Sequence, residues 1–416
     1  MSSNLSMEAK LAYQAYLDAN SLDERIVRLE IFLSKVTKHK ATEKIVALNK
    51  SRLSKLRAER DSELKRRKAL TAASEDPFTL KREPHCLQVV FVSDFFEHQG
   101  VGKTTLLKCL TGLTQARPGI FTATPLIGIY DWNQIKFQLV DEPALQEGRN
   151  LSRILGGIKN TDILCILLDL TRNPVYQLQK VLEHLNIASI YLNRHPPNIK
   201  ITKTGSGGMQ LFFLSKAAKK SEHLTPFLNE MGGEYGSKNL MVKIYEEITV
   251  EEIGMAFNRA SRYIPAIIIA TKADLPNTKE NFTKLQDFLT KTHLSFQVIP
   301  VAVTIAEDGT ESCQGFENFG NVILEKLDMI RVYTKSTKCV AERPLVLPRE
   351  STIKDVALKI HKELFNTFTF AMVYRATDEQ PTEEREYTEY IPPTRIKAGL
   401  NFKIEQNDII EIHSRI

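Results

Sequence analysis

The sequence predicts an α/β protein with a largely parallel sheet, and two observations indicate this fold class. Short apolar runs rich in β-branched residues recur at residues 87–92, 135–140, 162–170, 266–276 and 296–303. Helical patterns separate them, and the clearest follows the first run directly. Strands that alternate with helices form parallel sheets, because each connection crosses a face of the sheet as a helix.

The chain before the first strand predicts a helical arm. Residues 6–70 contain neither Pro nor Gly, and their apolar residues recur at spacings of three and four. These residues are Ile26, Leu29, Leu33 and Val36, and then Ile45, Leu48, Leu53 and Leu56. The periodicity is helical. We therefore expect a helical hairpin joined near residues 37–42, whose second helix starts after Thr42.

Composition along the chain predicts the domain boundaries. The arm occupies residues 1–70, and residues 71–86, which contain two prolines, form a linker. The α/β domain spans residues 87–340 and is interrupted at about 174–250 by a small α+β unit with Pro-Pro and Gly-Gly turns. A last module at residues 341–416 combines one helical segment with strand-like ends.

Hydropathy and cysteine usage favour a cytoplasmic protein. The chain has 416 residues, of which 42% are hydrophobic and 25% charged, and no apolar run approaches the length of a membrane span. We therefore expect no membrane partner and no secretory signal. The five cysteines are scattered and never form a Cys-x-x-Cys pair. That pattern indicates a reducing compartment rather than a disulfide framework or a zinc site.

Positive charge is concentrated in the arm. Residues 37–68 contain twelve Lys or Arg and four Asp or Glu, a local charge of +8 in a chain whose net charge is +6. A basic segment on a near-neutral body predicts a polyanionic partner such as RNA. The candidate RNA-binding residues are Lys65, Arg66, Arg67 and Lys68. The alternative, a solvated helix face, stays open.

A phosphate-binding loop is the strongest local signal. Gly102, Lys103, Thr104 and Thr105 follow the strand at 87–92 and open a helix. Backbone N–H groups at such a junction point toward phosphates, and the helix dipole favours negative charge there. Lys103 can neutralise the β- and γ-phosphates, and the Thr104 hydroxyl can ligate Mg²⁺.

This loop departs from the usual pattern. The motif requires a Gly five residues before Gly102, where this chain has Glu97. Asp94 adds a second carboxylate, and a carboxylate facing a triphosphate repels it. Either both acids point away from the phosphates or they weaken binding. In the first case, Gly100 takes the place of the missing Gly.

The next strand supplies a metal-site carboxylate. Asp141 follows the run at 135–140, at the sheet edge where α/β proteins bind ligands. The usual Asp-x-x-Gly pattern ends here in Ala144. Alanine keeps the N–H that contacts a γ-phosphate but loses the backbone freedom of Gly. Gln146 lies farther along than a water-positioning Gln usually does.

The strand at 266–270 leads into a base-selecting motif. Its residues are Thr271, Lys272, Ala273 and Asp274. An Asp carboxylate accepts two N–H bonds from guanine and cannot do so from adenine, so such a site rejects adenine strongly. Lys272 is expected to lie along the base, and Thr271 replaces the more usual Asn.

These motifs, in this order, resemble those of the developmentally regulated GTP-binding protein (DRG) family of Obg-like P-loop GTPases. The segments that carry the resemblance are KHKATEKIVALNKSRLSKLRAE, FTATPLIGIYDWNQIKFQLVDEPALQEG, LNIASIYLNRHPPNIKITKTGSGG and NRASRYIPAIIIATKADLP. The tail from RVYTK to NDIIEI resembles a TGS domain, a ubiquitin-like β-grasp unit. The resemblance covers nearly the whole chain, and its four departures from the family motifs indicate a divergent member.

The resemblance implies a slow, Mg²⁺-dependent GTPase that binds GTP and GDP. It would act with ribosomes or translation factors and pair with a small stabilising protein. The implied catalytic residues are Lys103 and Thr104. The nucleotide site would add Gly100, Val101, Gly102, Thr105, Asp141, Ala144, Thr271, Lys272, Asp274 and Ala302. The metal ligands would be Thr104, Asp141 and either Thr122 or Thr124. The alternative is a scaffold or assembly factor that binds ribosomal RNA without significant hydrolysis.

Overall fold

The computed structural model contains two compact units, residues 1–79 and 80–416. It describes residues 6–19, 22–37, 42–72, 77–95, 100–113, 123–148, 150–205, 207–234, 239–305, 311–336, 339–375 and 394–415. For residues 18, 64–72, 234, 305 and 311 it describes the backbone only. Among the described helices, none combines the length and apolarity needed to cross a lipid bilayer.

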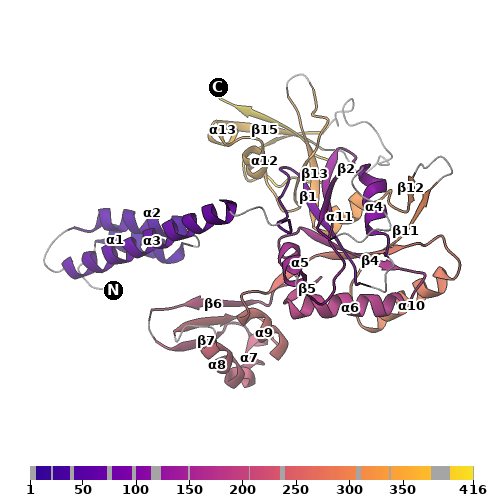
Figure 1. Cartoon of the computed structure of the whole chain (residues 1–416). Coiled ribbons are helices and arrows are strands. Elements are labelled where there is room, and N and C mark those ends of the chain that lie inside the picture. Colours follow the sequence, from indigo (N-terminus) through magenta and orange to yellow (C-terminus); the bar gives the residue numbers. More distant parts are fainter. Residues whose placement is uncertain are drawn as a thin grey trace. The chain divides into compact units, whose positions relative to one another are not determined.

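The arm contains three helices, not the two predicted (Figure 1). They are α1 (Met7–Asp18), α2 (Leu22–Lys35) and α3 (Glu43–Ala72). The break between α1 and α2 follows Ala19, whose backbone is extended. Asn20 and Ser21 come next in the sequence, and such residues favour turns over helix. The start of α3 after Thr42 is as predicted, and the carbonyl of Thr42 accepts the Val46 N–H.

A seven-stranded sheet forms the core of the second unit, with strand order β12-β11-β10-β4-β1-β3-β2. Its strands are β1 (Leu87–Val92), β2 (Leu126–Trp132), β3 (Ile135–Asp141), β4 (Ile163–Asp169), β10 (Ala266–Thr271), β11 (Val298–Ile305) and β12 (Glu311–Gln314). The five central strands are parallel, and the edge strands β2 and β12 are antiparallel. The predicted α/β class is confirmed.

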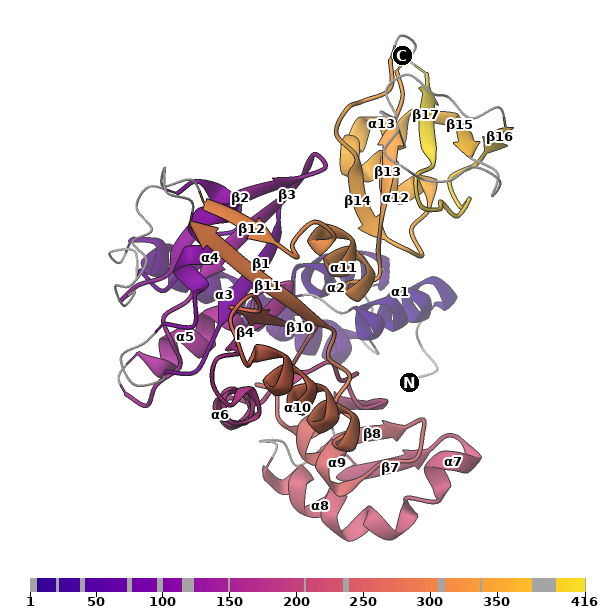
Figure 2. The same cartoon turned by 90° about the vertical axis from the view of Figure 1, so that its right-hand side faces the viewer.

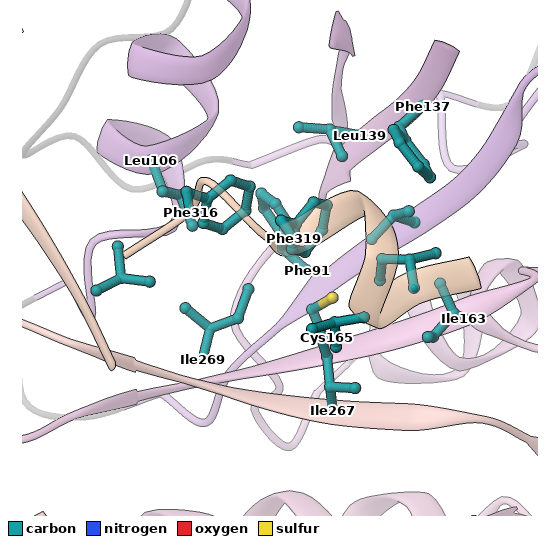
Figure 3. Close-up of a cluster of buried hydrophobic side chains, with 14 of the residues drawn as sticks. Phe91, Leu106, Phe137, Leu139, Ile163, Cys165, Ile267, Ile269, Phe316 and Phe319 are labelled. Atoms are coloured by element: carbon teal, nitrogen blue, oxygen red, sulfur yellow. The ribbon is translucent and has the colours of Figure 1, made fainter. Parts of the chain in front are cut away.

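Helices cover both faces of this sheet (Figures 1 and 2). They are α4 (Lys103–Thr111), α5 (Leu151–Ile158), α6 (Pro174–Ile187), α10 (Thr278–Lys291) and α11 (Phe319–Lys326). Helices α4 and α11 enclose a cluster of buried side chains, in which Phe316 and Phe319 stack beside Phe91 and Phe137 (Figure 3). The thiol of Cys165 is buried in the same cluster, as its apolar surroundings predict.

A smaller α+β unit is inserted between β5 (Ile190–Leu192) and β9 (Arg262–Ile264), two strands that pair with each other in parallel. It contains β6 (Ile199–Lys203), β7 (Met209–Phe213), α7 (Lys216–Lys219), η1 (Glu222–Leu224), α8 (Thr225–Glu234), β8 (Leu240–Ile244) and α9 (Val250–Phe257). The sequence assigned the helix starting at residue 174 to this unit. That helix, α6, instead packs on β4 and α10 of the main domain, because its apolar face is buried there.

The last sheet has five strands in the order β14-β13-β17-β15-β16. The module consists of β13 (Met329–Thr334), β14 (Leu345–Pro348), α12 (Ile353–Ile360), α13 (Lys362–Asn366), β15 (Phe368–Arg375), β16 (Thr394–Ala398) and β17 (Ile409–Ser414). The predicted start at residue 341 is therefore too late. The strand β13 carries the buried Ile330 and Val332 of this module's own core.

Candidate nucleotide-binding site

The loop between β1 and α4 is the candidate phosphate-binding loop. Gly102 caps α4 with φ of 93°, a left-handed conformation that favours Gly. The first backbone N–H groups of a helix have no partner within it, so those at Lys103, Thr104 and Thr105 can face an anion. Gly100 and the buried Val101 complete the described part of the loop, and Glu97 lies outside the described residues.

Lys103 is held in place by a residue that the sequence did not single out. Its Nζ donates to the Ser93 hydroxyl at 2.8 Å and lies 3.9 Å from Asp141 Oδ1. Burial lowers the pKa of Lys103, and the carboxylates of Asp141 and Glu142 partly oppose that shift. A buried cation next to the helix N-terminus is suited to bind phosphate.

Thr104 and Asp141 form the second polar pair. The Thr104 hydroxyl donates to Asp141 Oδ2 at 2.5 Å, and the Asp141 side chain is fully buried. Its other oxygen, Oδ1, has no hydrogen-bond partner in the part of the chain that the structure describes. A buried carboxylate oxygen without a partner, beside a hydroxyl, fits the hard oxygen ligands that Mg²⁺ prefers. Of the two switch threonines, Thr124 is solvent-exposed and Thr122 lies outside the described residues.

Glu142 is a second buried carboxyl group that the sequence analysis missed. It is fully buried, and neither of its oxygens has a hydrogen-bond partner among the described residues. Burial, and secondarily the charge of Asp141, raises its pKa to about 8, against the opposing effect of Lys103. Glu142 therefore keeps its proton to a higher pH than an ordinary glutamate does.

Asp94 points away from the phosphate side. Its Oδ1 lies 3.8 Å from Nε2 of His184 on α6, whereas the preceding Ser93 contacts Lys103. Successive side chains of an extended segment face opposite ways, which explains the difference. Burial raises the pKa of Asp94. The segment pairs with the chain beyond β3, since Leu145 donates to the Ser93 carbonyl and accepts from the Phe95 N–H.

The strand β10 is tied to the candidate phosphate loop by one hydroxyl. Thr271, at the end of β10, donates through Oγ1 to the Val101 carbonyl oxygen at 2.8 Å. The Leu168 carbonyl lies 3.2 Å from the same hydroxyl. Thr271 is nearly buried, so this contact is shielded from water. Thr271, at the position where Asn is usual, therefore provides a polar link between the two halves of the candidate site.

The remaining residues of the motif lie in the turn after β10. Lys272 has φ of 60°, and its Nζ contacts Asp169 Oδ2 at 2.6 Å. Burial alone would raise the pKa of Asp169, but hydrogen bonds from Lys272 and Thr171 hold it below its ordinary value. Asp274 is exposed in the turn. Ala302 lies in β11 next to Val301, whose carbonyl accepts the Ala273 N–H.

Comparison with known proteins identifies the two main domains. Residues 98–201 match the family described as 50S ribosome-binding GTPase, and residues 330–414 match the TGS domain. The chain is 26% identical over 408 residues to an uncharacterized GTP-binding protein of Methanocaldococcus jannaschii, covering 95% of this chain and 93% of that protein.

The chain is a homologue of the developmentally regulated GTP-binding proteins. It is 25% identical over 398 residues to developmentally-regulated GTP-binding protein 1 of Xenopus laevis, covering 93% of this chain and 98% of that protein. It is also 25% identical over 409 residues to ribosome-interacting GTPase 1 of Saccharomyces cerevisiae, covering 94% and 98%. Like them it has a GTP-binding GTPase domain, and the resemblance drawn from the motifs is confirmed.

Ala144→Gly should increase the preference for GTP over GDP. Gly restores the backbone freedom that lets the N–H at this position reach a γ-phosphate. One added hydrogen bond to a charged group predicts a change of about tenfold in the ratio of the two dissociation constants. Isothermal titration with each nucleotide measures that ratio.

Asp94→Asn is the matched comparison for that measurement. Because Asp94 faces His184, its neutralisation should leave the ratio unchanged. A larger effect from Asp94→Asn than from Ala144→Gly would mean that the acid, and not the missing Gly, limits recognition of the γ-phosphate.

Proposed function

We propose that this chain is a slow, Mg²⁺-dependent GTPase switch that acts with ribosomes in the cytoplasm. The observation that carries this proposal is the hydrogen bond from Thr271 to the Val101 carbonyl. It joins the strand that precedes Asp274 to the loop that precedes Lys103. The base and the phosphates of one guanine nucleotide would therefore bind in a single site. The description of the matched GTPase family and the name of the yeast relative support the ribosome as partner.

The roles of the residues follow from their contacts. The N–H groups at the start of α4 and the ammonium group of Lys103 would hold the phosphates. Thr104 and Asp141 would hold Mg²⁺, which supplies charge neutralisation between the β- and γ-phosphates. Asp169 would keep the aliphatic stem of Lys272 in place beside the base.

Slow turnover follows from the same geometry. Gln146, the nearest glutamine after the metal-site carboxylate, is exposed and lies beyond Ala144. Within the described part of the chain, no hydrogen bond or ion pair holds the Gln146 side chain in a position to orient an attacking water. Hydrolysis would then rest on electrostatic stabilisation, with an intrinsic rate on the order of 10⁻³ per second or below.

A single-turnover assay with purified ribosomes tests this proposal. The chain loaded with γ-labelled GTP should release phosphate slowly alone and faster when ribosomes are added. Bound GTP that stays intact under both conditions would exclude a hydrolysing switch. It would favour the second candidate function, a ribosome-associated scaffold, which the unpartnered Glu142 and the Ala144 substitution support.

The arm should bind RNA through phosphate contacts. Replacing Lys65, Arg66, Arg67 and Lys68 by Ala should weaken binding to ribosomal RNA and reduce its salt dependence. If all four side chains contact phosphates, the slope of log K against log salt concentration should fall by about 3. Filter binding at several salt concentrations measures this slope, and GTP binding by the same variant is the control. An unchanged slope would favour the solvated-face interpretation.

A further inference from the structure

The sheet of the small α+β unit has one open face. Its strands lie in the order β6-β8-β7, and the helices of the unit cover one side of them. Alternate side chains, among them the fully buried Val242 and Ile244, face those helices. In Figure 2 α8 and α9 lie together on one side of β7 and β8. Among the described residues, the other alternate side chains stay exposed or half-buried, and Lys200 and Phe212 are exposed.

A row of three side chains crosses this open face. Lys200 on β6 pairs with Lys243 on the central strand β8, and Lys243 pairs with Phe212 on β7. Neighbouring strands lie about 4.8 Å apart, so both lysines start within about 10 Å of the Phe212 strand. Phe212 is 41% exposed. The open face therefore places an exposed ring beside two cations.

The same end of the face exposes two more large apolar side chains. Leu214 and Tyr245 continue β7 and β8, tied by hydrogen bonds from the Leu214 N–H to the Ile244 carbonyl and from the Tyr245 N–H to the Asn198 carbonyl. They are 51% and 37% exposed. Single exposed apolar residues are common on protein surfaces, but a group of three on one uncovered face marks an interaction site.

The positive charge of the open face indicates a negatively charged partner. The three strands contain three lysines and no carboxylate. The nearest acids that follow β8 already have partners, since Glu246 accepts from Asn198 and Glu247 pairs with Lys220. Among the described residues, no ion pair engages Lys200 or Lys243. Both ammonium groups are therefore available to a partner with negative charge.

We infer that this open face, defined by Lys200, Phe212, Lys243 and Tyr245, binds single-stranded RNA. Exposed aromatic rings on a sheet stack on unpaired bases, and flanking lysines contact the phosphates. A duplex hides the faces of its bases, so it could use the lysines only. This activity goes beyond the nucleotide site and uses a different sheet.

Binding of a short single-stranded RNA to the full chain tests the inference. The probe is a labelled oligo-uridine of about 12 nucleotides, a length within the range of single-strand binding folds. Phe212→Leu should weaken binding about tenfold, because the stacking ring is lost. Phe212→Trp keeps an aromatic ring and should leave the affinity close to that of the unmodified chain. Lys200→Gln with Lys243→Gln should lower the salt slope by about 1.4, which is two single-strand phosphate contacts.

A matched double variant controls for the general effect of removing two positive charges from this unit. Lys216→Gln with Lys219→Gln removes two exposed lysines from α7 of the same unit and should leave the affinity for oligo-uridine nearly unchanged. The measurements are made without nucleotide, so a failure of GTP binding would not affect them. Melting curves of all variants check that each one folds.

Two results would overturn the inference. One is equal loss of RNA affinity in the α7 control and in the face variants, which would mean that only net charge matters. The other is unchanged oligo-uridine binding by the face variants. If the same variants also lose binding to RNA-free ribosomal proteins, the face contacts a protein partner. Crosslinking of a 4-thiouridine probe to residues 209–216 would confirm the contact directly.

Discussion

Asp274→Asn should convert the site from a guanine to a xanthine nucleotide specificity. The Asp274 carboxylate lies exposed in the turn after β10, where it can accept two N–H bonds from guanine. An Asn at this position presents a donor to the extra carbonyl of xanthine and loses one acceptor for guanine. A site that leaves a ligand donor unpaired loses affinity on the order of a thousandfold or more.

Competition binding with GTP and XTP measures this exchange of specificity. Asp287→Asn is the matched control, because it removes one exposed carboxylate from α10 of the same domain. It should not change the relative affinities of the two nucleotides. If Asp274→Asn leaves the preference for GTP intact, another group recognises the base and the assignment of this motif is wrong.

Gly320→Ala should destabilise the GTPase domain strongly. A Cβ at Gly320 in α11 would lie 2.0 Å from Cε3 of Trp132 and 2.2 Å from its Cδ2. The indole is nearly buried, and its Nε1 donates to the Glu317 carbonyl at 2.9 Å. It cannot move aside without breaking that hydrogen bond and disturbing the aromatic cluster of Figure 3. Overpacking of this severity predicts a loss on the order of 3 kcal/mol.

Denaturant unfolding monitored by tryptophan fluorescence measures this loss, because Trp132 is the only tryptophan of the chain. The matched control is Gly156→Ala in α5, where an added Cβ meets nothing within 4 Å. That change should stabilise the domain by about 1 kcal/mol through helix propensity.

A double-mutant cycle separates the steric effect from other causes. In a Trp132→Ala background, followed by circular dichroism, Gly320→Ala should become neutral or stabilising, because the clashing ring is gone. An equal loss of stability in both backgrounds would show that the indole is not the cause.

The central strands could be predicted from sequence because each is a continuous apolar run. The edge strands were missed because their signals are weaker. The strand β2 contains Gly128, which reduces strand propensity, and the structure gives the reason for that Gly. A Cβ there would lie 2.8 Å from the side chain of Thr111 on α4. The strand β12 is short and polar, so nothing in its composition distinguishes it from a loop.

Within the candidate site, sequence motifs indicate which residues would face the ligand, but the contacts that support these residues could not be predicted. Motifs predict which residues face the ligand, whereas Ser93, Glu142 and Asp169 act through partners that are distant in sequence. Ser93 contacts Lys103 ten positions away, and Asp169 contacts Lys272 across 103 positions. The sequence did contain a signal for Glu142. Buried strands usually end in apolar residues, and a second charged residue directly after Asp141 departs from that pattern.

Equilibrium binding of GTP, GDP and ATP to the unmodified chain tests the central claim most directly. The contacts of Lys103 and Asp141, and the exposed Asp274, predict that both guanine nucleotides bind in the presence of Mg²⁺. They should bind about a hundredfold tighter than ATP, or more. Equal affinity for GTP and ATP, or no binding of any of the three, would contradict the account.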